Sequence, residues 1–258
     1  VFGIDMKLTR KAVTTTVFAL AACSCANAAF EINIVGVVPP NVGTVEPGGS
    51  VVDPVNGAQA QFELSLLDTV TMASSTAYLT VTLDSYTPDL LKHSITTGQG
   101  HSDRVGILIE GGSERSATYT FSFYEDSDFL TPLQLDFVMQ VSDIDSSEEF
   151  SVSDTEFTGV TLSEGTQLKE LTPGTAGFIG LTNSEGENPD KANPQAAANF
   201  SSIANVSSFQ VIVAGSATGY GSEFQFDFTP DIVVPEPSTY ACLLGLAALT
   251  TVAMRRRK

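Results

Sequence analysis

The chain has 258 residues, with 30 acidic residues against 12 lysines and arginines, so its formal net charge is −18 at pH 7. A surface this acidic repels phosphate polymers before contact, which excludes nucleic acid as a partner. Tryptophan is absent, and the three cysteines stand at positions 23, 25 and 242, close to the two ends. We therefore expect a central region without disulfides, stabilised by its core packing.

Residues 1–28 comprise a few upstream residues followed by a segment that is typical of a secretory signal peptide. The expected initiator is Met6, and three cations precede an apolar run at residues 12–22. Ala26 and Ala28 are the small residues that a signal peptidase reads. A lipoprotein box ending at Cys23 is the alternative. We favour cleavage after Ala28, because a chain with its own C-terminal anchor gains little from a lipid at its other end.

Hydrophobic residues alternate with polar ones through residues 29–228, which predicts about ten strands and almost no helix. Such alternation is typical of antiparallel sheets that bury one face. Only residues 89–93 and 195–199 suggest single helical turns. The expected strands are residues 30–38, 61–66, 76–83, 105–109, 118–123, 133–141, 157–162, 209–213 and 224–228.

Glycine- and proline-rich turns separate these segments, which favours a fold of two packed sheets. The predicted class is all-β, an antiparallel, jelly-roll-like β-sandwich that fills residues 29–228 as one domain. A division into two smaller β units near residues 111–116 is the alternative. Residues 229–237 form the linker that follows the domain.

An acidic run at residues 143–149 is the sharpest local feature of the central region. Asp143 and Asp145 continue the parity of the apolar positions in residues 133–141, so a strand running on would point both carboxylates into the core. Unpaired charges there cost several kcal/mol each. Either the strand ends near residue 141, or a cation such as Ca²⁺ neutralises the pair, with Glu148, Glu149 or Asp154 completing its shell. A solvated acidic turn is the plain alternative.

The region of residues 29–234 carries 5 lysines and arginines against 28 acidic residues, a formal charge of −23. Its two histidines, His93 and His101, lie in a polar segment without a recognisable nucleophile motif, so we expect no enzyme. A glycan-binding module with an exposed tyrosine, such as Tyr78, Tyr86 or Tyr220, is one alternative. A secreted polysaccharide hydrolase with two opposed carboxylates is another.

The chain closes with a short apolar segment between a proline motif and four cations. As a helix, residues 240–254 rise about 22 Å, less than the roughly 30 Å hydrocarbon core of a bilayer. Flanking residues make up the difference, so residues 238–258 are predicted to be a transmembrane helix with a basic, cytoplasmic tail. The expected sorting residues are Pro235, Glu236 and Pro237, with Arg255, Arg256 and Arg257 as the stop.

This order of Pro-Glu-Pro motif, apolar span and arginine cluster resembles the PEP-CTERM sorting signal. The resemblance covers about a tenth of the chain and implies nothing about the fold of the rest. It implies export in a Gram-negative bacterium, with an inner-membrane intermediate processed by an exosortase and a signal peptidase. Such proteins accompany extracellular polysaccharide. We therefore expect a structural or adhesive protein on the cell envelope or secreted into the matrix, with Ca²⁺ as the one cofactor to consider.

Overall fold

The computed structural model describes residues 30–38, 51–68, 72–98, 101–145, 147–171, 174–183, 196–203, 205–216 and 221–230. These residues belong to one compact unit, Ala29–Ile232. The predicted signal peptide and the predicted transmembrane segment both lie outside them. Within the described part of the chain, no helix has the length and apolar character needed to cross a membrane.

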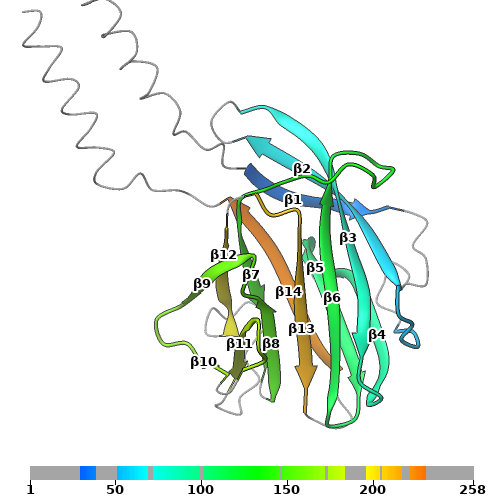
Figure 1. Ribbon diagram of the computed structural model, residues 1–258, viewed down its shortest axis with the longest axis vertical. Helices are drawn as coiled ribbons and strands as arrows, with labels where there is room; N and C mark the ends of the chain where they lie inside the picture. The colour runs from blue at the N-terminus through cyan, green and yellow to red at the C-terminus, as the bar shows by residue number, and fades with distance from the viewer. Residues whose placement is uncertain are drawn as a thin grey trace, which may run out of the picture. The chain divides into compact units, whose positions relative to one another are not determined.

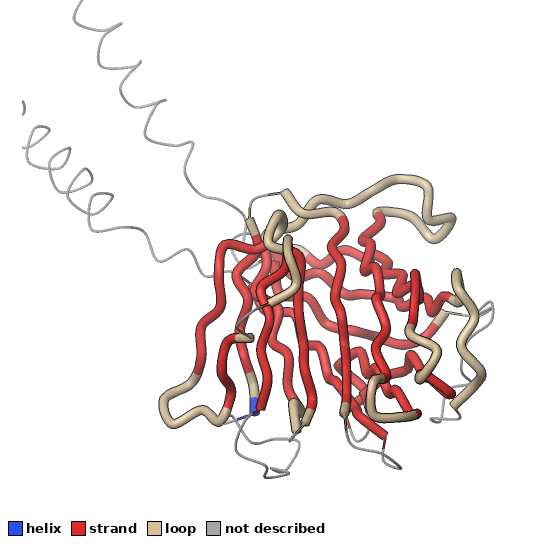
Figure 2. The backbone as a smooth tube through the Cα atoms, turned by 60° about the horizontal axis from the view of Figure 1, so that its bottom comes forward, coloured by secondary structure: helices blue, strands red, loops and turns tan. Residues whose placement is uncertain are grey.

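Fourteen strands form two antiparallel sheets in the described residues, as Figures 1 and 2 show. The larger sheet has the order β1-β2-β3-β6-β13-β8-β11-β10, and the smaller one β4-β5-β14-β7-β12-β9. The larger sheet comprises β1 (Phe30–Val37), β2 (Gln59–Asp68), β3 (Ser74–Tyr86), β6 (Arg115–Tyr124), β13 (Ser208–Gly215), β8 (Glu148–Ser153), β11 (Phe178–Asn183) and β10 (Leu168–Glu170). The smaller comprises β4 (Leu90–Gly98), β5 (His101–Gly111), β14 (Gly221–Pro230), β7 (Phe137–Ser142), β12 (Ala198–Ser202) and β9 (Phe157–Leu162).

The all-β prediction is confirmed, and so is the packing of two antiparallel sheets. Strands from before and after residues 111–116 stand next to one another in both sheets, for example β6 beside β13 and β5 beside β14. The chain therefore does not divide at that point. At one edge, β1 pairs with β2 and also packs against β5 and β14 of the other sheet, so it partly closes the sandwich there (Figure 1).

Alternation of hydrophobic and polar residues builds the core as predicted. Along β6, every second side chain from Arg115 to Phe123 is buried and every other one is half-exposed. The centre of the core is a cluster of phenylalanine rings from both sheets. Phe121 stacks on Phe209 with centroids 5.0 Å apart and meets Phe226 of the opposite sheet at the same distance. Burying one such ring contributes about 1.5–3 kcal/mol, which makes this cluster the main stabilising element.

Several segments differ from their predicted structure. Residues 89–93 were expected to include a helical turn, but residues from Leu90 onward form strand β4, which pairs with β5. The other expected helical turn, residues 195–199, overlaps strand β12, and the strand predicted at residues 133–141 begins at Phe137. The end of the acidic run, where no strand was predicted, begins strand β8 at Glu148. In β4 and β8 polar residues occupy inward positions, including His93 and Glu148. The hydrophobic pattern therefore did not reveal them.

Candidate functional site

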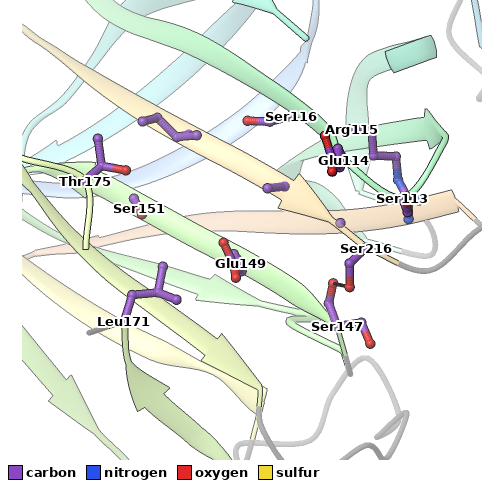
Figure 3. A pocket seen from close by; sticks show the side chains of 13 residues that line it. Ser113, Glu114, Arg115, Ser116, Ser147, Glu149, Ser151, Leu171, Thr175 and Ser216 are labelled. Atoms are coloured by element: carbon purple, nitrogen blue, oxygen red, sulfur yellow. Dashed lines mark hydrogen bonds between the residues drawn. The ribbon is translucent and has the colours of Figure 1, made fainter. Parts of the chain in front are cut away.

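A pocket of about 320 Å³ lies at one end of the larger sheet, where β6 begins, β13 ends and β8 begins (Figure 3). We call it the serine pocket, because five serines are among its lining residues: Ser113, Ser116, Ser147, Ser151 and Ser216. Two carboxylates, Glu114 and Glu149, also line it. Arg115 lines it as well, so hydroxyl and carboxylate groups stand beside one basic residue.

The floor of the pocket is a small grid of side chains on the outer face of the sheet. Ala214 of β13 is paired with Ser116 of β6 on one side and with Glu149 of β8 on the other. Two residues earlier on β13, Ile212 is paired with Ser151 of β8. Residues two apart on a strand point to the same face, so this grid is shared by three strands. The small side chain of Ala214 lies at its centre, which leaves the hollow.

The walls come from turns at the ends of these strands. Ser113 and Glu114 belong to the turn between β5 and β6, whereas Leu171 and Thr175 come from the segment between β10 and β11. The Ser216 amide donates to the Ser147 carbonyl at 2.9 Å, and its hydroxyl donates to the same oxygen at 3.1 Å. These bonds join the end of β13 to the start of β8 and fix the rim.

Two lining hydroxyls have no protein partner among the described residues. Ser151 is 4% exposed as a residue, and its side chain makes no hydrogen bond there. The hydroxyl of Ser116 likewise has none in this part of the chain. Both hydroxyls can therefore donate to and accept from a molecule in the pocket.

Beneath the floor, Arg115 points inward and is 1% exposed. Its Nη2 donates to the Ser222 hydroxyl of the opposite sheet at 2.7 Å, and its Nη1 donates to the Gly112 carbonyl at 3.2 Å. Gly215 makes room for this guanidinium, because a Cβ atom there would lie 2.7 Å from Nη2. Arg115 thus ties the strand below the pocket to the second sheet.

Glu148 lies beside Arg115 and is also buried. Its carboxylate accepts from the Asp145 amide at 2.7 Å and from the Ser222 hydroxyl. Burial raises the pKa of Glu148 to about 8, and the carboxylates of Asp145 and Asp143 add to this rise. The two hydrogen bonds oppose it. Glu148 therefore retains its proton over much of the physiological pH range.

The four carboxylates predicted to bind calcium are divided between two sides of the larger sheet. Strand β7 ends at Ser142, and Asp143 follows in a left-handed turn (φ 65°) while remaining buried. Asp145 and Glu148 lie with it on the inner side, whereas Glu149 is exposed and lines the serine pocket. Within the described ranges, no three histidine, cysteine or acidic side chains are grouped to hold a metal ion. The calcium hypothesis stays a prediction.

The other residues singled out in the sequence lie apart from the pocket. His93 is fully buried in β4, its Nδ1 is 3.3 Å from the Tyr119 hydroxyl, and burial lowers its pKa to about 4. Tyr78 is half-buried against the ring of Phe129, while Tyr86 is partly exposed. The side chain of His101 and all of Tyr220 lie outside the described residues. The described side chains of His93, Tyr78 and Tyr86 do not line the serine pocket.

The predicted processing residues also lie outside the described part of the chain: Ala26, Ala28, Pro235, Glu236, Pro237, Arg255, Arg256 and Arg257. Comparison with known families bears on the C-terminal group. Residues 233–258 match the PEP-CTERM protein-sorting motif. The chain carries a PEP-CTERM signal. Signals of this kind are recognised by exosortases and mark exported proteins that pass through a membrane-anchored intermediate, so the match indicates export with an exosortase as the processing partner.

No curated protein matches the PEP-CTERM chain as a whole. Among solved structures, the N-terminal domain of the Streptococcus gordonii adhesin Sgo0707 is similar at 13% identity and TM-score 0.46, over 81% of this chain and 62% of that one. The match thus spans less than two thirds of the Sgo0707 domain. The adhesin domain of PrgB from Enterococcus faecalis is similar at 13% identity and TM-score 0.34, over 78% of this chain and 86% of that one.

The same PrgB domain bound to DNA is similar at 11% identity and TM-score 0.32, over 77% of this chain and 90% of that one. TM-scores below 0.5 and identities this low carry no information about ligands, so neither adhesion nor DNA binding follows for this chain. Inferences about function therefore rest on the PEP-CTERM signal and on the geometry of the described β-sandwich.

Proposed function

We propose that this protein is an exported, surface-displayed structural or adhesive component of an extracellular polysaccharide matrix in a Gram-negative bacterium. The observation that carries the proposal is the match of residues 233–258 to the PEP-CTERM motif. That motif supplies the route to the cell envelope, with an exosortase and a signal peptidase as processing partners. The acidic β-sandwich is the cargo, and its charge of −23 favours neutral or basic polymers over nucleic acid.

The sorting route is tested by replacing Pro235, Glu236 and Pro237 with alanine in the native host. We expect the variant to accumulate, unprocessed, in the inner membrane, while the wild-type chain reaches the outer surface or the medium. Replacement of Thr250 and Thr251 by alanine leaves the motif and the apolar span in place and serves as the matched control. Unchanged surface display of the Pro-Glu-Pro variant would refute this route.

The proposed role is non-enzymatic. In support of this, Glu148, the described carboxyl whose pKa lies well above its usual range, points inward and away from the serine pocket. A glycosidase needs such a carboxylic acid at the sugar, opposite a second carboxylate. The test is incubation of the full chain with extracellular polysaccharide from its host, followed by a reducing-sugar assay. We expect no release, and release that Glu114→Gln or Glu149→Gln abolishes would overturn the non-enzymatic role.

Association with the matrix has its own test. The full-length chain, purified in a mild detergent, is mixed with extracellular polysaccharide from the same host and sedimented. We expect the protein to sediment with the polymer at physiological salt. Recovery of all protein in the supernatant would contradict matrix association without affecting the sorting route.

A further inference from the structure

We propose that the serine pocket binds one sugar residue that carries no negative charge, a neutral hexose or an amino-bearing hexosamine unit of a glycan. This inference rests on the proposed matrix association and adds to it a site and a class of ligand. Three features of the pocket carry it: serine hydroxyls without a protein partner among the described residues, a pair of carboxylates, and a small apolar floor (Figure 3).

The hydroxyl groups give the pocket the donors and acceptors that match a sugar ring. A serine hydroxyl both donates and accepts, as a sugar hydroxyl does, so the two form reciprocal hydrogen bonds. Ser151 is 4% exposed and lacks a protein hydrogen bond within the described chain, and Ser116 stands across Ala214 from the β8 side of the floor. A sugar hydroxyl seated at Ser151 therefore finds a partner that can both donate and accept.

The carboxylates decide which sugars are accepted. Ionised Glu114 and Glu149 are acceptors only, so they pair with hydroxyl or ammonium groups and repel carboxylate, sulfate and phosphate. The charge of −23 on the surrounding domain acts in the same direction. Arg115 also lines the pocket, but its guanidinium is buried and donates to Ser222 and Gly112. The carboxylates therefore still disfavour uronic acids and other anionic sugars, and an amino sugar gains a charge-assisted bond that a neutral one lacks.

The apolar part of the pocket matches the carbon face of a sugar ring. Ala214 and Ile212 form the middle of the floor, and Leu171 forms part of one wall. The volume of about 320 Å³ lies at the lower end of the range for small-molecule sites, roughly 300–1,000 Å³, so the pocket suits one ring rather than a long chain segment.

The scaffold under the floor holds this arrangement in place before a ligand arrives. Arg115 anchors the start of β6 to Ser222 of the second sheet, and the Ser216–Ser147 hydrogen bonds join β13 to β8. Three strands are therefore fixed relative to one another at the pocket. A preformed site avoids part of the ordering cost of binding, which matters for a ligand with few contacts.

The test is isothermal titration calorimetry of the full-length chain in mild detergent against a panel of oligosaccharides. The panel contains neutral hexose oligomers of glucose, galactose and mannose, the corresponding hexosamine oligomers, and galacturonic acid oligomers. We expect a neutral or amino oligomer to bind with a dissociation constant of about 0.1–1 mM, which is typical of a single small ligand, and the acidic oligomer not to bind.

Three variants of the pocket should weaken this binding by different amounts. Ala214→Leu fills the floor and should lower affinity at least about tenfold, while Ser151→Ala should lower it about threefold to tenfold. Glu149→Gln keeps the shape and removes the charge, so it should weaken the amino oligomer about fivefold and the neutral one less. Thermal melts within about 2 °C of wild type establish that each variant is folded.

Two variants outside the pocket serve as controls. Ser208→Leu adds a leucine side chain to the same face of β13, six residues from Ala214, and Glu125→Gln removes a charge just beyond the far end of β6. Both should bind within about twofold of wild type. Equal binding by wild type and the pocket variants would overturn the sugar site while leaving matrix association intact, and so would preference for the acidic oligomer. A chain that sediments with the host polysaccharide and binds no oligomer of the panel would likewise overturn it.

Discussion

The middle and one end of the same sandwich are built in opposite ways. In the middle, Phe121 of β6, Phe209 of β13 and Phe226 of β14 pack ring on ring without polar atoms. At the end, the same three strands carry Arg115, Gly215 and Ser222, which bury a guanidinium and its hydrogen bonds. Hydrophobic packing supplies most of the stability in the middle, whereas the polar end contributes little net energy and holds three strands in a defined position.

The largest effect is expected from the middle. Phe121→Ala removes a fully buried ring that contacts aromatic side chains of both sheets, and we expect a loss of about 3–5 kcal/mol in the free energy of unfolding. Chemical denaturation followed by circular dichroism measures it. The matched control is Phe129→Ala in the loop after β6, where the ring is only half-buried and the loss should be about 1 kcal/mol. Equal losses would show that the phenylalanine cluster is not the main source of stability.

The polar end should make stability fall as pH rises. The unfolded pKa of Glu148 is 4.5 and its folded pKa is about 8, so its contribution is fully present below pH 4.5 and is lost as pH rises through 8. The limiting slope is about 1.4 kcal/mol per pH unit. We expect the stability of the wild type to fall by up to this amount per pH unit across the window relative to Glu148→Gln, whose curve lacks this slope.

Denaturation of both proteins at a series of pH values from about 5 to 9 gives this difference directly. The comparison with Glu148→Gln removes the contribution of the other acidic residues, which titrate in both proteins. Parallel curves for wild type and variant would mean that the folded pKa of Glu148 is not raised.

His93, which lies next to Tyr119 in the core, should have the opposite effect and make stability fall as pH decreases. Burial lowers the pKa of His93 from 6.5 to about 4, so the unfolded chain takes up a proton in this window while the folded chain does not. Its contribution is therefore complete above pH 6.5 and is lost as pH falls towards 4, by up to about 3 kcal/mol. His93→Gln cannot titrate and should lose less stability over the same window. A steeper loss for the variant than for wild type would contradict this assignment.

Gly215 tests how closely the polar end is packed. In Gly215→Ala the new methyl group would lie 2.5 Å from the Ser222 hydroxyl and 2.7 Å from Arg115 Nη2, so one of these side chains must shift. We expect a loss of about 1–2 kcal/mol, less than for a full cavity in the core. Gly159→Ala on β9 has no atom within 4 Å of the new carbon and should change stability by less than about 0.5 kcal/mol. Similar values for the two variants would show that the space around Arg115 is not tight.

The sequence was sufficient for elements whose inward residues are hydrophobic and insufficient where they are polar. Alternation predicted β6, β13 and β14, because their inward side chains include Phe121, Phe209 and Phe226. The sequence of strand β8 looks like an acidic turn, because Glu148 occupies an inward position. Contacts made elsewhere in the fold, with Asp145 and Ser222, make this buried carboxyl acceptable. The hydrophobic pattern within one strand contains no information about such contacts.

The serine pocket could not be predicted for a related reason. Its floor joins Ser116, Ala214 and Glu149, which are far apart in the chain and meet only through the register of β6, β13 and β8. Serines in strands are common and carry no local signal, so only strand pairing reveals that they face one hollow. The PEP-CTERM signal is the opposite case, because its residues are contiguous and the sequence alone was enough.

Calcium removal should have the smallest effect of all. The sequence hypothesis places the ion on Asp143, Asp145, Glu148 and Glu149, but Glu149 lies on the outer side, away from the other three. A structural ion at the remaining inner group would raise the melting temperature, and excess EDTA would lower it by several degrees. We expect a shift below about 2 °C, with Asp145→Asn melting equally with and without EDTA. A larger shift in wild type that Asp145→Asn abolishes would establish the calcium site after all, because only an ion bound at that carboxylate links the two changes.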